Sequence, residues 1–198
     1  MRRRILVLSV AVVAVVASAC SSGGHHSAPG TTTSTTASAG PNPDVIPSVI
    51  TPAYVDAVFR VLNHIKGDAT RELFAADAVD EKVRDDLRAL FTDPLFAQEM
   101  ANASASLKVN RSTLRQPIGD VLTHVRRVVS ASSTCIFVET TSDFSAVDVR
   151  PGRAASEYWA LVPKPPTNDP ELLNRTPWAL SFNADYLTPT SVPDQCRA

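Results

Sequence analysis

Apolar and polar positions divide the chain into a helix-forming part and a strand-forming part. From residue 52 to residue 106, apolar side chains recur three or four positions apart, a spacing that predicts amphipathic helices. Thr51 and Pro52 are typical of a helix start, and Gly67 is typical of a helix end. Further helices are predicted over residues 69–75, 80–91 and 94–106. Four helices are therefore expected in the first part.

After Leu107 the pattern changes to short runs rich in β-branched and aromatic residues. These runs predict strands over residues 120–130, 134–141, 157–162 and 178–186. Strict alternation in the first strand would place Val121, Val125 and Val129 on one face. Helices followed by strands predict an α+β fold, in which amino-terminal helices pack on a curved antiparallel sheet of about four strands.

The first nineteen residues have the pattern of an export signal. Arg2, Arg3 and Arg4 precede an uncharged run from Ile5 to Ala19. That run is shorter than the roughly twenty residues that a membrane-spanning helix needs. We therefore expect residues 1–19 to direct export.

The residues that follow resemble the lipobox of bacterial lipoproteins. Small residues stand directly before a cysteine in Ala17-Ser18-Ala19-Cys20. The resemblance implies that the chain is cut before Cys20 and that lipid on Cys20 holds the protein on the extracytoplasmic face of the cell membrane. The bias towards Arg over Lys, among abundant Ala, Val and Thr, is of an actinobacterial type.

Between Cys20 and the folded part, residues 20–44 are rich in Ser, Thr, Gly and Pro. This composition predicts a disordered tether, followed by a single domain over residues 45–198. His25 and His26 stand in the tether without further ligand residues nearby, so we expect no metal there.

Charge and motifs narrow the function classes. Removal of residues 1–19 leaves 16 Lys+Arg against 20 Asp+Glu, a net charge of −4. A basic surface for nucleic acid is therefore not expected. The chain has no glycine-rich phosphate loop, no Cys-x-x-Cys and no Gly-x-Ser-x-Gly motif, so we expect no cofactor.

The two remaining cysteines, Cys135 and Cys196, suit a disulfide, because such bonds persist outside the cytoplasm. The bond would join the last residues of the chain to a central strand. In the alternative, Cys135 is a buried free thiol and the tail is loose.

The order of elements over residues 49–186 resembles the cone-shaped fold of nuclear transport factor 2 and SnoaL-like domains. The resemblance implies a concave sheet face that holds a pocket, and a homodimer through the open sheet face. Candidate pocket residues are His124, Arg126, Tyr158, Trp159 and Trp178. His124 with Asp120 or Asp143 would be a general base pair, whereas in the alternative His124 and Arg126 are solvated and Asp143 forms a turn.

Other polar residues have structural interpretations. His64 is expected at the end of the first helix, where the helix dipole favours it. Asp56 and Arg60 are expected to form an exposed ion pair one helical turn apart. The segment Asn174-Arg175-Thr176-Pro177-Trp178 resembles segments of other envelope lipoproteins, but the resemblance carries no function.

The leading hypothesis is a membrane-tethered envelope lipoprotein without enzymatic activity, whose domain serves as a protein-interaction or accessory module, with envelope proteins as candidate partners. An alternative is a carrier that holds a small apolar ligand or lipid in the cone. A third hypothesis is an enzyme of the isomerase or dehydratase kind.

Overall fold

The computed structural model describes residues 40–197 except 109–110, 151–154, 166–171 and 186–191. These residues belong to one unit that begins at Gly40. Cys20, His25, His26, the predicted export signal and the predicted tether as far as residue 39 lie outside the described residues. Within the described part of the chain, none of the helices has the length and apolar character that crossing a membrane requires.

Among the described residues, three α-helices come first, where the sequence pattern predicted four. Helix α1 spans Pro52–Ala76, α2 spans Glu81–Leu90 and α3 spans Asp93–Ser106. Thr51 caps α1 as predicted, because its side-chain oxygen accepts a hydrogen bond from the Tyr54 N–H at 3.2 Å. Gly67 does not end α1, and the helix predicted over residues 69–75 is its last part. The helix ends at Asp77, whose φ is 53°.

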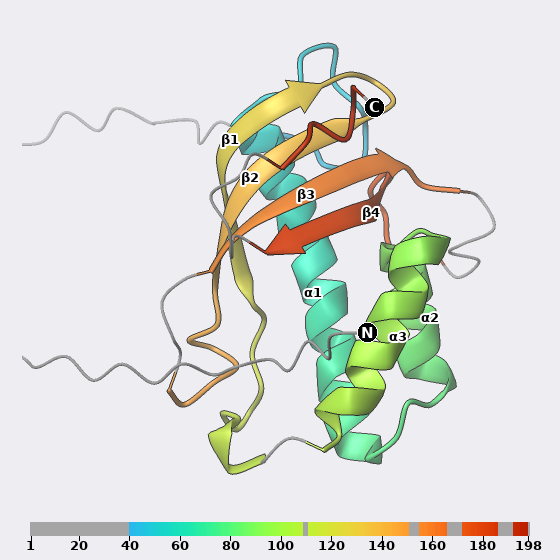
Figure 1. The fold of residues 1–198 in the computed structure, drawn as a ribbon, viewed down its shortest axis with the longest axis vertical. Helices are drawn as coiled ribbons and strands as arrows, with labels where there is room; N and C mark the ends of the chain where they lie inside the picture. Colours follow the sequence, from blue (N-terminus) through green and yellow to red (C-terminus); the bar gives the residue numbers. More distant parts are fainter. Residues whose placement is uncertain (1–39, 109–110, 151–154, 166–171, 186–191, 198) are drawn as a thin grey trace, which may run out of the picture. The chain divides into compact units, whose positions relative to one another are not determined.

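In the part of the chain that the structure describes, four strands follow the helices (Figure 1). Strand β1 spans Leu122–Ala131, β2 Ile136–Asp143, β3 Ala155–Pro163 and β4 Trp178–Asp185. They pair in the order β1-β2-β3-β4, with each neighbouring pair antiparallel. The predicted α+β class, with helices before an antiparallel sheet of four strands, is confirmed.

Strand β1 does not alternate as predicted, because two bulges interrupt its pairing with β2. The register shifts between Val125 and Arg127, and again between Val128 and Ser130. Each extra residue reverses the side on which the following side chains lie. Val125 and Val128 therefore pack against the core, and the prediction that placed Val129 with Val125 is wrong.

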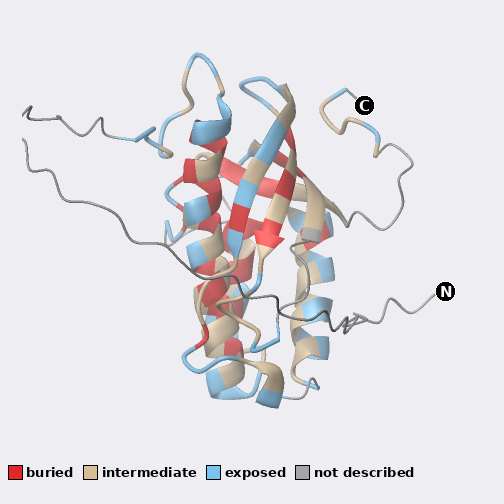
Figure 2. Ribbon diagram, turned by 90° about the vertical axis from the view of Figure 1, so that its left-hand side faces the viewer, coloured by how far each residue is buried: buried red, intermediate tan, exposed pale blue. Residues whose placement is uncertain are grey.

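The core lies between α1 and one face of the sheet (Figure 2). Trp178 is fully buried there, and its indole N–H donates a hydrogen bond to the Tyr54 hydroxyl at 2.8 Å. Burial raises the pKa of Tyr54 above its usual value, although the bond with Trp178 opposes this effect. The ring of Trp159 meets that of Phe59 edge-on at 6.4 Å. Large side chains therefore fill the space between α1 and the sheet.

The loop before β4 is held by a buried asparagine. Asn174 is 0% exposed, and its Nδ2 donates to the carbonyl oxygens of Ala89 at 3.0 Å and Trp178 at 2.8 Å. Its Oδ1 accepts from the backbone N–H and the hydroxyl of Thr176. Ala89 lies in the last turn of α2, where carbonyl groups lack partners within the helix. The Asn174–Trp178 segment therefore joins α2 to β4.

We predict that Asn174→Ala lowers the free energy of unfolding by about 3 kcal/mol, because it leaves buried polar groups of Ala89 and Thr176 without partners. Urea denaturation measures the change. The matched control is Asn102→Ala, an exposed position on α3 whose amide donates to Glu99, where we expect a change below about 0.5 kcal/mol. Equal losses in the two variants would contradict this role of Asn174.

A disulfide joins Cys135 to Cys196, with Cα atoms 5.6 Å apart, as the sequence predicted. Next to it, the Ser130 hydroxyl donates a hydrogen bond to Asp194 Oδ1 at 2.7 Å. The last described residues are therefore fixed to the β1–β2 hairpin rather than loose.

Replacing both cysteines by serine should lower the free energy of unfolding by about 4 kcal/mol. Without the disulfide the unfolded chain gains conformational entropy, because no covalent bond closes the long loop between residues 135 and 196. Thermal and urea unfolding of the oxidised protein and of the double variant measure the difference. A reducing agent should lower the stability of the wild type and leave that of the variant unchanged. Equal stability of the oxidised wild type and the variant would refute a stabilising bond.

Candidate functional site

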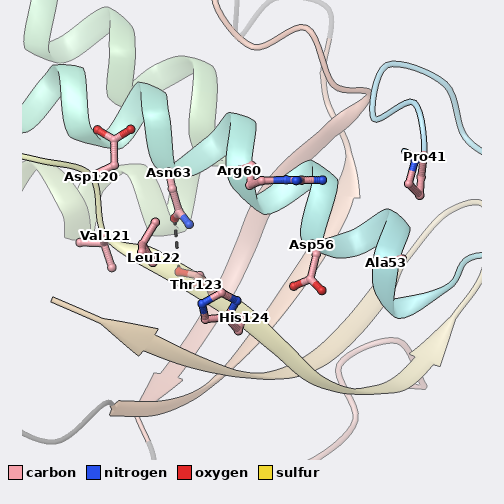
Figure 3. A pocket seen from close by; sticks show the side chains of 10 residues that line it. All are labelled: Pro41, Ala53, Asp56, Arg60, Asn63, Asp120, Val121, Leu122, Thr123 and His124. Atoms are coloured by element: carbon pink, nitrogen blue, oxygen red, sulfur yellow. Dashed lines mark hydrogen bonds between the residues drawn. The ribbon is translucent and has the colours of Figure 1, made fainter. Parts of the chain in front are cut away.

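A groove of about 430 Å³ runs between α1 and the start of β1 (Figure 3). One side consists of residues on α1, and the other side is the chain that leads into β1. Its lining residues are Ala53, Asp56, Arg60 and Asn63 on α1, Asp120, Val121, Leu122, Thr123 and His124 opposite them, and Pro41. Arg60, Leu122 and His124 are exposed to solvent. The groove is therefore an open surface feature.

Hydrogen bonds hold the two sides of the groove together. The Val125 N–H donates to Asp56 Oδ1 at 2.8 Å, which satisfies a backbone group on the outer edge of β1. The Thr123 hydroxyl bonds to Asn63 Oδ1 at 3.3 Å. The predicted ion pair between Asp56 and Arg60 does not form, because the carboxylate of Asp56 turns to the strand instead.

Beside the groove, four charged or titratable side chains form what we call the Asp120 cluster, which consists of His64, Asp68, Arg71 and Asp120. Asp120 Oδ1 accepts from Arg71 Nη1 at 2.8 Å, and Asp120 Oδ2 lies 3.0 Å from His64 Nδ1. Arg71 also donates to Asp68 Oδ1 at 2.8 Å and to the Ile118 carbonyl oxygen at 3.2 Å. The bonds to Asp68 and Asp120 raise the pKa of Arg71 above its usual value. The cluster therefore ties the chain entering β1 to the middle of α1.

Gly67 makes this cluster possible. It is buried inside α1, and a Cβ atom at this position would lie 2.0 Å from Asp120 Oδ1. Only glycine lets the carboxylate approach the helix so closely. Because α1 continues past Gly67 to Ala76, His64 lies in the interior of the helix, and the prediction that placed it at a helix end is wrong.

Sequence reasoning overlooked the Asp120 cluster, although one signal was present. The apolar spacing of Ile65, Ala69 and Leu73 continues in phase across Gly67. A glycine inside an unbroken helical pattern indicates a close contact rather than a helix end. The partner in that contact, Asp120, is distant in sequence and could not be identified from the pattern.

The five candidate pocket residues lie in different surroundings. His124 lines the groove, whereas Arg126 pairs with Glu139 at 3.2 Å. Trp159 and Trp178 are buried in the core against α1. Tyr158 precedes Trp159 in β3 and therefore lies on the opposite face of the sheet, where it stacks on Phe137 at 5.7 Å. The structure does not bring the five residues together in one pocket.

The proposed partners of His124 in a general base pair have other roles. Asp120 belongs to the Asp120 cluster, and Asp143 accepts hydrogen bonds from the backbone N–H and hydroxyl of Ser145. Asp143 therefore forms a turn, which is the alternative that the sequence left open. Among the residues that the structure describes, no group of three or more His, Cys, Asp or Glu side chains is arranged to hold a metal ion.

We predict that Gly67→Ala destabilises the protein by about 2 kcal/mol or more, because the added methyl group overlaps the Asp120 carboxylate. In an Asp120→Ala background the same change should be neutral or stabilising by up to about 1 kcal/mol, since alanine favours helix more than glycine does. A double-mutant cycle by urea denaturation measures this coupling. Equal effects in the two backgrounds would show that Asp120 does not press on Gly67.

Comparisons of this chain with protein-family models, with curated proteins and with solved structures found no match.

Proposed function

We propose that this chain is a cell-envelope lipoprotein whose folded part is a non-enzymatic protein-interaction module. Lipid on Cys20 would hold it at the extracytoplasmic face of the cell membrane, and the tether would give the module reach. The disulfide between Cys135 and Cys196 supports a location outside the cytoplasm. Helices packed on an antiparallel sheet are compatible with a cone of the nuclear transport factor 2 and SnoaL-like kind.

One observation carries the proposal of a binding module: the groove lies on the surface, while large side chains fill the space between α1 and the sheet. Trp178, Phe59 and Leu161 are all nearly or fully buried in that space. The groove offers charge and apolar surface together, which suits a segment of another protein.

The packed interior weighs against the carrier hypothesis. A second hollow, of about 120 Å³, lies among the three helices and is lined by residues such as Leu73, Leu87 and Ala103. This volume is below the 300 Å³ or so of a typical ligand pocket. The engagement of Asp120 and Asp143 in other contacts likewise weighs against an isomerase or dehydratase.

Site-specific photo-crosslinking in the native membrane tests the module. A photoreactive amino acid at Leu122, which is 49% exposed in the groove, should capture a defined envelope protein. The same probe at Arg84, an exposed position on α2, is the matched control and should not capture it. A crosslinked partner that is the same at both positions, or found at neither, would count against a binding groove.

Metabolic labelling with a palmitate analogue tests the anchor separately. The wild type should incorporate the label and sediment with membranes, whereas Cys20→Ala should do neither. Equal labelling of the two proteins would remove the lipoprotein from the proposal and leave the groove untouched.

A further inference from the structure

Several hydrogen-bond donors in the groove have no partner among the described residues, whereas its carboxylates do. Arg60 and His124 have no partner among the described residues, and the Asn63 amide uses its oxygen while its Nδ2 has none in that part of the chain. All three residues line the groove, Arg60 and Asn63 from α1 and His124 from β1 (Figure 3). The groove therefore presents unused hydrogen-bond donors from both sides.

The acidic residues of the groove are already engaged. Asp120 accepts from Arg71 and His64 within the Asp120 cluster. Asp56 accepts from the Val125 N–H through one oxygen. Because the carboxylates have partners and the cation Arg60 does not, the groove suits a ligand that carries acceptors and negative charge.

An apolar side chain adjoins these donors. Leu122 lines the same groove and is 49% exposed, so its apolar surface is open to a ligand. A small inorganic anion would leave Leu122 in water. A peptide segment with an apolar residue next to an acidic one would cover Leu122 and supply the missing acceptor.

We infer that the groove between α1 and β1 binds a partner segment through an Asp or Glu side chain, which bonds to Arg60, Asn63 and His124, while an adjacent apolar residue of that segment packs on Leu122. This inference rests on the proposed function, because it specifies the chemistry of the partner of the same groove. It identifies Arg60 as the residue that selects an acidic partner.

Binding of a short peptide to the full chain in mild detergent tests the inference. The probe is acetyl-Gly-Leu-Asp-Ala-Gly-amide carrying an uncharged dye, and its Asn analogue is the matched control. Fluorescence anisotropy should show that the Asp peptide binds about fivefold more tightly than the Asn peptide, and that this preference shrinks at high salt. Equal affinities of the two peptides would overturn the inference.

Variants test whether the groove is the site. Arg60→Gln should weaken binding of the Asp peptide by about fivefold and bring it to the level of the Asn peptide. Asp56→Asn, which keeps an oxygen for the Val125 N–H, should strengthen binding by about twofold because it removes a nearby negative charge. Arg84→Gln, which removes an exposed arginine on α2, should have no effect. Equal losses in Arg60→Gln and Arg84→Gln would overturn the inference, because they would indicate non-specific attraction.

Competition separates a peptide from a free anion. Inorganic phosphate that displaces the Asp peptide at millimolar concentration, with equal effect on the Asn peptide, would contradict a carboxylate-specific site. Partner crosslinking at Leu122 without preference for the Asp peptide would retain the binding module and discard this inference. Preference for the Asp peptide without a crosslinked partner would support a carboxylate-binding groove and count against an envelope protein as its partner.

Discussion

The side chain of Asn174 is the contact on which the arrangement of helices and sheet depends. Its Nδ2 group donates both to a carbonyl oxygen in the last turn of α2 and to that of the first residue of β4. A second contact reinforces the join, because the Thr92 N–H donates to the Leu180 carbonyl oxygen at 2.9 Å. Buried amides of this kind are costly unless all their hydrogen bonds are made, so the geometry around Asn174 is narrowly specified. Trp178 is thereby fixed against Tyr54, and the interior is filled.

Because side chains fill the interior, the features that could bind a partner lie on the surface. There the geometry depends on Gly67, which lets Asp120 lie against α1 and bond to Arg71 and His64. Because Asp120 stands just before β1, this contact sets the position of the strand relative to the helix. The groove lies between these two elements, so its shape depends on this contact. Structure and proposed binding are linked in this way through a single glycine.

The sequence predicted those features that depend on local pattern. Thr51 as the cap of α1, the four strands, and the helix-then-sheet order all follow from spacing and propensity. The sequence did not predict the features that depend on contacts between residues distant along the chain. Gly67 resembles a helix end until Asp120 is placed beside it, and the bulges in β1 separate Val129 from the face of Val125 without any local signal. The candidate site was missed for the same reason, since its two sides are more than fifty residues apart, as in the pair His64 and Asp120.

Hydrogen exchange at the Trp178 indole N–H tests the central claim most directly, because this group bonds to Tyr54 in the middle of the packed interior. If the interior is filled and held by Asn174, the indole proton should exchange only by global unfolding, with an opening free energy equal to that from urea denaturation. Rapid exchange of this proton in the native protein would contradict the account, because it would mean that water, and with it a ligand, reaches the space between α1 and the sheet.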